Sequence, residues 1–441
     1  MMVSGLMAKA ASRRLGFRLT GPMMSEIFPF VFRACCMPSI VVALLVGTAP
    51  TADAGFNVWT TSGPQDQFVT VLGMNPLMPA TLYAGTRGCA VIEGGDVFRS
   101  TDGAKSWVAL GLSRGVTALA IDPQTPTTVY AATCYDGVFK SVDGGGTWTP
   151  ANVGLEPPPD EPFPDLNVLA IDPTRPSTVY VGTNGVEKST DAGSTWSPVN
   201  TGLTSNLYCP FTDCPPVDVL AVDPTTPGTL YAGTGGLFKS TDGGSTWNGT
   251  GLTGVAVGTL AIDPKHPSTL YAGTDSGFLK SMDGGNTWSG TGLTAISVDA
   301  LAIDPGNPDT LYSGLFETSY GGENPSVLKS TDGGNTWSVL NTGLPPNTAV
   351  SALVIDATTP ATLYAATTGS GVFAIQQGAV CVGDCGGTHT VAVNDIITLV
   401  NIALGVLQPV ACANGGLPIG GDVDITVIVQ AVNNALKGCA G

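Results

Sequence analysis

Residues 238–247 read FKSTDGGSTW, which combines a strand-like start, an Asp-Gly-Gly turn and a tryptophan. Nearly the same string occurs at five other places in the 441-residue chain, and successive copies begin between 41 and 51 residues apart. This period is typical of a four-stranded propeller blade. The six turns are STDGAKSW (100–107), SVDGGGTW (141–148), STDAGSTW (189–196), STDGGSTW (240–247), SMDGGNTW (281–288) and STDGGNTW (330–337).

A second phrase precedes each turn and occurs seven times, as in TLAIDPKHPSTLYAGT. Within one unit, the ALAID segment predicts a buried innermost strand, TLYAGT a second strand and GLFKS a third, each bounded by Pro or Gly turns. The residues after the tryptophan predict a fourth strand. The sequence therefore predicts an all-β, seven-bladed propeller over residues 55–378.

The seventh unit stops after its third strand and lacks a tryptophan of its own. Residues 55–64, GFNVWTTSGP, resemble the missing piece, because Trp59 is followed by a polar strand as in the TWSPVNTG segment. We therefore expect the N-terminal strand to complete the last blade and close the ring, which removes the open sheet edges that invite aggregation.

The S-x-D-x-G-x-T-W pattern resembles the Asp-box (BNR) repeat of sialidases, sortilin-type receptors, xyloglucan-processing glycosidases and a photosystem II assembly factor. With the DPxxPxTLYAGT phrase, the resemblance covers about 320 residues. It implies a β-propeller fold. It does not imply one activity, because these families share the repeat and not their chemistry.

A turn that recurs six times is expected to be part of the framework. Its aspartate can accept hydrogen bonds from the N–H groups of the turn, its glycines supply positive φ, and its tryptophan can fill the seam between sheets. We also assign to the framework the basic residue before each turn: Arg99, Lys140, Lys188, Lys239, Lys280 or Lys329. The aspartates and tryptophans predicted to be structural are Asp102, Asp143, Asp191, Asp242, Asp283, Asp332, Trp107, Trp148, Trp196, Trp247, Trp288 and Trp337.

Residues 1–54 have the features of a secretion signal: arginines precede the apolar run SIVVALLVGTA, and the small-x-small pattern Ala52-Asp53-Ala54 follows. The alternative, a membrane anchor, needs about 20 apolar residues, and no segment of the chain reaches that length. Cleavage would leave 12 basic and 32 acidic residues. A net charge of −20 disfavours nucleic acid as a partner.

Ten cysteines are present, and eight follow the predicted signal. An even number in an oxidising, extracellular or periplasmic compartment indicates disulfides. Cys209 and Cys214 are expected to close the loop YCPFTDC. Cys89 and Cys134 occupy equivalent positions in the first two units, which predicts a disulfide between those blades. Four cysteines of the C-terminal tail allow three pairings, and the sequence does not choose among them: Cys381, Cys385, Cys412 and Cys439.

Length varies between units only in two classes of loop. One class joins the second strand to the third, as in residues 86–96 and 315–326, and the other joins the fourth strand to the next unit, as in residues 154–167 and 201–218. In a propeller both classes open on one face, which we call the variable-loop face. Function resides on variable loops held by a rigid scaffold, although solvated insertions without a ligand remain the alternative.

Carboxylates and aromatics gather in these loops, a combination that suits a sugar or a basic protein partner. The predicted ligand contacts are Tyr135, Tyr208, Glu317, Tyr320 and Glu323. Sialidase activity is rejected: after residue 54 the chain has four arginines and no Arg-Ile-Pro motif. His266 and His389 form no triad or zinc motif.

After residue 378 the composition changes, and residues 379–441 contain two short segments with helical periodicity. They resemble the calcium-loop-and-helix halves of a type I dockerin. Asp384 and Asp395 match the first and twelfth loop positions, but Gly386 and Thr388 replace oxygen ligands. The tail is thus expected to rely on disulfides more than on calcium, and no cofactor is expected to be required.

The sequence favours a secreted binding or adhesion protein. Its propeller would recognise a glycan or protein, and its tail would dock to a cohesin-like or cell-surface partner. The alternative is a xyloglucanase-like glycoside hydrolase with an appended dockerin-like module, since carboxylates are available although no catalytic pair stands out.

Overall fold

The computed structural model describes most of the chain after residue 54. The described residues are 55–65, 67–88, 94–155, 166–203, 216–294, 296–315, 327–346, 348–356, 358, 361–377, 391, 393–407, 427–429, 431, 432 and 435. The predicted secretion signal lies outside them.

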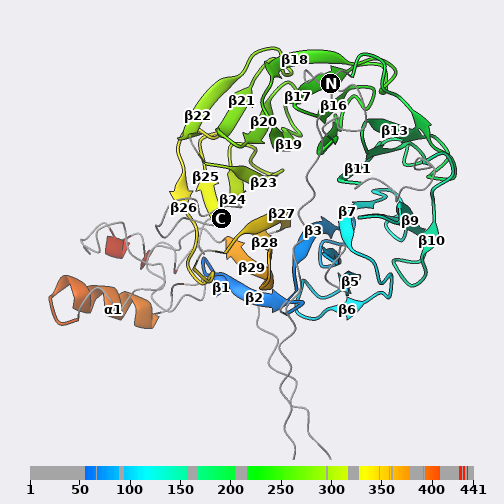
Figure 1. Ribbon diagram of the computed structural model, residues 1–441. Helices are drawn as coiled ribbons and strands as arrows, with labels where there is room; N and C mark the ends of the chain where they lie inside the picture. The colour runs from blue at the N-terminus through cyan, green and yellow to red at the C-terminus, as the bar shows by residue number, and fades with distance from the viewer. Residues whose placement is uncertain are drawn as a thin grey trace, which may run out of the picture. The chain divides into compact units, whose positions relative to one another are not determined.

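The strands form seven antiparallel sheets arranged in a ring (Figure 1). The strands of the first four blades, from the innermost outward, are β3 (Val69–Met74), β4 (Leu82–Thr86), β5 (Val97–Ser100) and β6 (Val108–Ala109); β7 (Val116–Ile121), β8 (Val129–Thr133), β9 (Val138–Ser141) and β10 (Thr149–Pro150); β11 (Val168–Ile171), β12 (Val179–Gly182), β13 (Val186–Ser189) and β14 (Ser197–Pro198); β15 (Val219–Val222), β16 (Leu230–Gly233), β17 (Gly236–Ser240) and β18 (Asn248–Thr253).

The fifth and sixth blades have the same order, and the seventh takes its outer strands from the other end of the chain. Their strands are β19 (Val257–Ile262), β20 (Leu270–Thr274), β21 (Gly277–Ser281) and β22 (Ser289–Thr294); β23 (Val298–Ile303), β24 (Leu311–Leu315), β25 (Val327–Ser330) and β26 (Ser338–Val339); β27 (Val350–Asp356), β28 (Ala361–Thr367) and β29 (Gly371–Gln377), with β1 (Gly55–Phe56) and β2 (Thr60–Gly63) beside β29.

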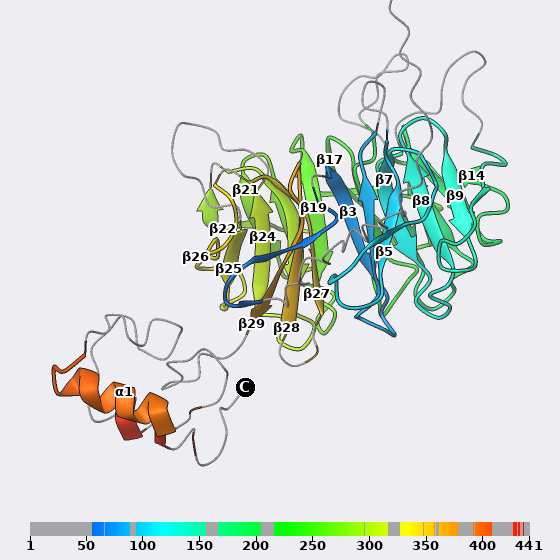
Figure 2. The ribbon, with the colours of Figure 1, turned by 90° about the horizontal axis from the view of Figure 1, so that it is seen from below.

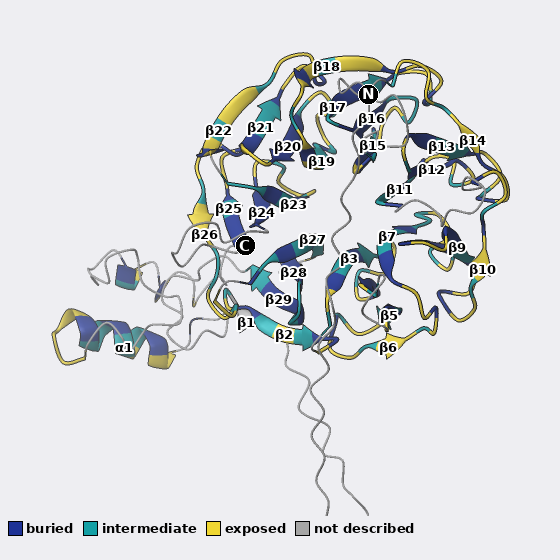
Figure 3. Cartoon of the chain, in the orientation of Figure 1, coloured by how far each residue is buried: buried dark blue, intermediate teal, exposed yellow. Residues whose placement is uncertain are grey.

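Burial within a blade follows the hydrophobic pattern of the repeat. Every residue of a second strand such as β4 or β20 is buried, because its two faces pack against both neighbouring blades. Inner strands such as β7 alternate buried and half-buried residues. The outer strands β10 and β26 are exposed, as the edge colouring of Figure 3 shows. The sequence-based assignment of four strands to each unit is therefore confirmed.

The ring closes through the N-terminal strand, as the sequence predicts. β2 pairs antiparallel with β29, and Thr60 lies opposite Ala374. Trp59 is only 2% exposed, and its indole Nε1 donates to the carbonyl oxygen of Leu340 at 2.6 Å. A second, parallel pairing of β1 with β29 was not anticipated. The fold is thus a seven-bladed β-propeller whose last blade uses both ends of the propeller segment.

The repeated turn is held by its aspartate and serine. In the turn at residues 240–247, Asp242 accepts hydrogen bonds from Thr246 N and Ser240 Oγ, each at 2.8 Å, and from Thr246 Oγ1 at 2.6 Å. Ser240 Oγ in turn accepts from Gly244 N at 2.9 Å. The hydroxyl and amide of Thr246, followed by Ser240, lower the pKa of Asp242 to about 2. Gly243 and Gly244 both have positive φ.

Neighbouring blades are joined through these same turns. Lys239 Nζ and Tyr231 Oη both donate to the carbonyl oxygen of Gly284 in the next turn, at 3.0 and 3.2 Å. The ammonium of Lys239 also lies 5.4 Å from the centre of the Tyr231 ring, a cation–π contact. This geometry supports a framework role for the basic residue. At the sixth seam Lys329 Nζ contacts Gln377 Oε1 instead, because the seventh blade has no such turn.

The tail contains a helix, α1 (Val393–Ala403), and helical residues 427–429, 431, 432 and 435. These segments share a small apolar core: Val391, Leu399, Ile402, Val427 and Ala431 are buried together. Both helical segments predicted in the tail are thus present. Among the described residues, no helix has the length and apolar character needed to span a membrane.

Candidate binding site on the variable-loop face

The two classes of variable loop hydrogen-bond to each other. Cys134 N, in the loop after β8, donates to Gly115 O, in the loop before β7, at 3.1 Å. Val217 N, before β15, donates to Thr183 O, after β12, at 2.8 Å. The loops therefore meet at the same end of the blades, as expected for one propeller face. The edge-on view in Figure 2 shows strands that run from one face of the ring to the other.

Of the five predicted ligand contacts, Tyr135 is described. It lies in the loop between β8 and β9, and 41% of its surface is exposed. Tyr208, Glu317, Tyr320 and Glu323 lie outside the described residues. Their participation therefore stays a prediction.

Tyr135 borders a cavity of about 260 Å³ that opens among the first three blades. Thr70 on β3 and Thr117 on β7 come from two inner strands, and Asn167 immediately precedes a third, β11. Arg87 enters from the loop after β4 and is exposed. One aromatic ring, two hydroxyls, an amide and a guanidinium thus surround one small volume, a mixture of apolar and hydrogen-bonding groups typical of a small-molecule site.

A second arginine lies beside Tyr135. Arg114, in the loop before β7, forms an ion pair with Asp136, with a distance of 3.0 Å from Nε to Oδ2. Both side chains are about half exposed, 48% and 47%, so the pair contributes little to stability. The ion pair affects the local charge instead. The chain is strongly acidic, but this part of the face carries Arg87 and Arg114, and Arg114 neutralises Asp136.

The inner-strand residues around the cavity link neighbouring blades. Thr70 Oγ1 donates to Val116 O at 2.6 Å, Thr117 Oγ1 donates to Leu166 O, and Asn167 Nδ2 donates to Asp218 Oδ1 at 2.9 Å. These bonds fix the orientation of three cavity-lining side chains before any ligand arrives. The site is therefore preorganised at its inner edge.

Asp218 is the carboxylate nearest to this edge in the hydrogen-bond network. Asp218 is exposed, but the protein around its carboxyl raises the pKa by partial desolvation, and the hydrogen bond from the Asn167 amide opposes that shift. A carboxyl group with a raised pKa is a candidate proton donor. Asp299, at the matching position of β23, accepts a hydrogen bond from Ser297 Oγ at 3.2 Å.

Sequence reasoning missed the contributions of Arg87, Thr70, Thr117, Asn167 and Asp218 to this face. A signal was available for the last four, because the position before the ALAID-type segment varies between units while the segment itself repeats. The residues at that position are Thr70, Thr117, Asn167, Asp218, Gly258, Asp299 and Ser351. Arg87 had no such signal, since it lies in a loop of variable length.

Cys134 is disulfide-bonded. A Cβ added to Gly115 would lie 2.9 Å from both Cys134 Sγ and the backbone of Gly88, so Cys134 is close to the residue that precedes Cys89. Cys89 itself lies outside the described residues, and its pairing with Cys134 stays a prediction. The other predicted disulfide cysteines also lie outside them: Cys209, Cys214, Cys381, Cys385, Cys412 and Cys439.

Within the described part of the chain, no group of three or more His, Cys, Asp or Glu side chains could hold a metal ion. Asp395 lies in the first turn of α1 and is 9% exposed, whereas its predicted calcium-loop partner Asp384 is outside the described residues. Calcium binding by the tail therefore remains untested.

Comparison with known sequences gives one short similarity. No family model matches the chain. A probable oligoxyloglucan-reducing end-specific xyloglucanase of Neosartorya fischeri is 32% identical over 85 residues, which are 18% of this chain and 10% of that protein. The similarity is too short to show that the chain belongs to the xyloglucanase family.

Solved structures resemble the whole propeller. The GH74 xyloglucanase from Xanthomonas campestris has a TM-score of 0.57 at 19% identity, covering 72% of this chain and 53% of that one. YCF48 from Cyanidioschyzon merolae has a TM-score of 0.54 at 12% identity, covering 73% of this chain and 98% of that one. The chain thus spans about half the length of the xyloglucanase but nearly all of YCF48. At these identities the similarity establishes a shared fold, the seven-bladed β-propeller.

Proposed function

We propose that the protein is an extracellular binding protein whose propeller recognises a glycan through the cavity on the variable-loop face. One observation carries the proposal: the cavity combines the exposed Tyr135 ring with Arg87 and with the preorganised polar groups of Thr70, Thr117 and Asn167. A sugar presents an apolar ring face for stacking and hydroxyls for hydrogen bonds, and this set of side chains matches both.

The remaining parts of the proposal rest on the sequence. Residues 1–54 would direct secretion, and the tail at residues 379–441 would dock the propeller to a cohesin-like or cell-surface partner. The small apolar core of the tail supports a separate unit in that region.

The proposal is tested with the mature chain, residues 55–441, on a glycan array, followed by calorimetric titration of each hit. Tyr135→Ala and Arg87→Ala should each weaken binding about tenfold or more, because truncated anchors at a binding site commonly cost more than about 1 kcal/mol. The control is Arg175→Ala, since Arg175 is another exposed arginine but lies in the loop between β11 and β12. Alanine variants of Tyr208, Glu317, Tyr320 and Glu323 belong in the same titration.

Two results would contradict this reading. Unchanged affinity in both cavity variants would place the ligand elsewhere. Failure to bind any glycan, together with capture of a protein through the same residues, would make the ligand a protein instead.

The second candidate function is polysaccharide hydrolysis. The sequence similarity to a xyloglucanase and the shared fold with GH74 enzymes favour it. Among the described carboxylates of the variable-loop face, Asp218 is the best candidate for a general acid, because its pKa is raised and its orientation is fixed by Asn167. Release of reducing ends from xyloglucan that is lost in Asp218→Asn would support the hydrolase; no release by the unaltered protein would exclude it for this substrate.

A further inference from the structure

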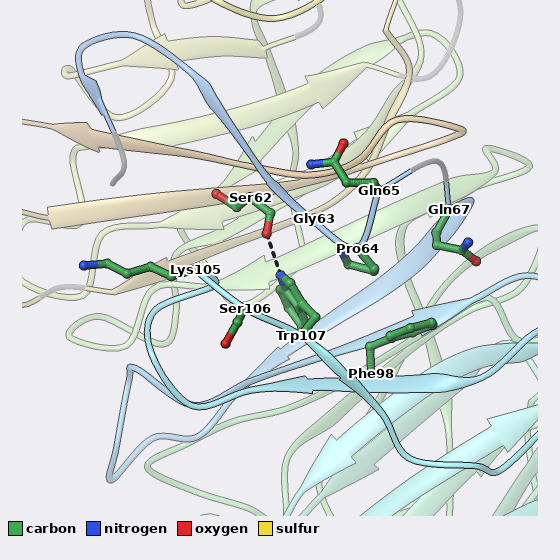
Figure 4. Close-up of a pocket in the computed structure, with 9 residues that line it drawn as sticks. All are labelled: Ser62, Gly63, Pro64, Gln65, Gln67, Phe98, Lys105, Ser106 and Trp107. Atoms are coloured by element: carbon green, nitrogen blue, oxygen red, sulfur yellow. Dashed lines mark hydrogen bonds between the residues drawn. The ribbon is translucent and has the colours of Figure 1, made fainter. Parts of the chain in front are cut away.

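A larger cavity, of about 410 Å³, lies at the rim of the propeller between the seventh and first blades. Its walls come from three segments: the chain that follows β2, strand β5, and the turn before β6 (Figure 4). The residues that matter here are Ser62, Pro64, Gln65, Gln67, Phe98 and Trp107.

At three other seams the corresponding tryptophan is buried and covered by a leucine. Trp196 Nε1 donates to Ala151 O at 2.8 Å, and four residues after Ala151 comes Leu155, which packs in the same core cluster. Trp247 and Leu203 repeat this arrangement, with Trp247 Nε1 bonded to Val199 O at 2.7 Å. The two tryptophans are 5% and 3% exposed.

The same cover is present over the tryptophan that closes the ring. Trp59 bonds to Leu340 O, and Leu344 follows four residues later in the shared cluster. A leucine at this spacing therefore seals the indole at three seams.

The seam between the seventh and first blades keeps the hydrogen bond but lacks the leucine. Trp107 Nε1 donates to Ser62 O at 2.8 Å, which aligns Ser62 with Ala151 and Val199. The residues that follow are Gly63, Pro64 and Gln65, and the fourth position in the sequence is Asp66 rather than leucine. Trp107 is half-buried, as are Trp148, Trp288 and Trp337, and it borders an open cavity.

We propose that this rim cavity binds one pyranose unit of a glycan, with an apolar ring face against Trp107 and Phe98. An indole and a phenyl ring supply apolar, polarisable surface for the C–H face of a sugar with equatorial hydroxyls. Gln65 is exposed and Gln67 half-buried, so their amides can donate to and accept from those hydroxyls. Pro64 completes a rigid wall that loses little conformational freedom on binding.

The rim site is separate from the cavity on the variable-loop face. It shares no lining residue with that cavity, and it uses the segment after β2 rather than the inner strands. Either site can therefore bind while the other does not.

The test uses the mature chain and cellotetraose, whose glucose units carry equatorial hydroxyls, with saturation-transfer NMR and titration calorimetry. We expect the axial ring protons to receive the strongest saturation. Gln67→Ala and Gln65→Ala should each weaken binding about threefold to tenfold, the effect of one lost neutral hydrogen bond. Thr201→Ala is the matched control, because Thr201 is exposed at a seam that retains its leucine. Tyr135→Ala should leave this binding unchanged.

The proposal fails if cellotetraose shows no saturable binding, or if both glutamine variants bind it as tightly as the unaltered protein does. Binding that is lost only in Tyr135→Ala would assign the sugar to the other cavity and would equally reject the rim site.

Discussion

Glu187 departs from the repeat. The same position on the third strand holds Phe139 in the second blade and Phe238 in the fourth. Glu187 Oε2 is buried and has no hydrogen-bond partner, and burial raises the pKa of this carboxyl to about 7. The charged form is therefore destabilising in the folded protein, because desolvation is not repaid by a partner.

We predict that Glu187→Leu stabilises the propeller, and more so at pH 8 than at pH 5. The pKa of Glu187 is near 7 in the folded protein and near the usual 4.5 in the unfolded chain. Between these pH values the folded protein therefore holds a proton on Glu187 that the unfolded chain has lost. The free energy of unfolding should then fall as the pH rises between these values. After allowance for partial solvent contact, the difference between the two pH values should be about 1–2 kcal/mol.

The measurement is urea unfolding of both proteins at the two pH values. The two proteins share every other titrating group. The difference between their free energies of unfolding therefore reports the pH-dependent contribution of Glu187. A stabilisation that does not depend on pH would contradict the assignment.

The aspartates of the repeated turn illustrate the opposite case. We predict that Asp242→Ala lowers the melting temperature but leaves ligand affinity of the folded fraction unchanged, because Asp242 bonds only within its own turn. Its pKa of about 2 lies below the usual 3.8, so its contribution should be present above pH 3.8 and lost as the pH falls toward 2. Asp275→Ala is the control for the melting temperature, because Asp275 lies in the exposed loop after β20. Loss of ligand affinity in the folded fraction of Asp242→Ala would show that the repeated turn is a ligand-binding site.

At the scale of elements, the N-terminal strand closes the ring of blades. We predict that deletion of residues 55–64 lowers the melting temperature sharply. It removes β1 and β2 and thereby exposes the edge of β29. It also removes Trp59, and loss of a buried aromatic costs about 3–5 kcal/mol. Calorimetric melting of the deletion variant beside Trp59→Ala separates the aromatic contribution from the strand pairing. A deletion that melts like the intact chain would refute closure by this strand.

Repetition explains why the elements could be predicted from the sequence. Six copies of the turn and seven of the strand phrase give the same signal many times, so errors in single copies average out. The parallel pairing of β1 with β29 had no such support, because it occurs once and involves Gly55 and Phe56 alone.

The candidate sites were less predictable because each depends on departures from the repeat. The cavity beside Tyr135 needs residues from three blades, and their proximity follows from the ring rather than from sequence spacing. At the rim cavity, no leucine stands four residues after Ser62. The effect of this difference on the contacts of Trp107 is recognised only by comparison with the covered Trp196 and Trp247.

At the scale of the whole molecule, we expect the propeller and the C-terminal tail to be stabilised differently. The propeller is held by its ring closure and by the repeated contacts between blades. Among its described residues, the tail has a small core that includes Leu399 and Ala431, both fully buried. Domains as short as residues 379–441 commonly need disulfides or a metal for independent stability.

We predict that disulfides, and not calcium, supply this stabilisation. The sequence places Cys381, Cys385, Cys412 and Cys439 in the tail, whereas Gly386 and Thr388 stand where a calcium loop needs oxygen ligands. Thermal unfolding of a fragment of residues 379–441, followed by circular dichroism, should therefore be unchanged by chelator. Reductant should lower the midpoint strongly, since loss of a disulfide in a small domain typically costs about 2–5 kcal/mol. A fragment that unfolds with chelator and withstands reductant would show that a metal ion holds the tail together.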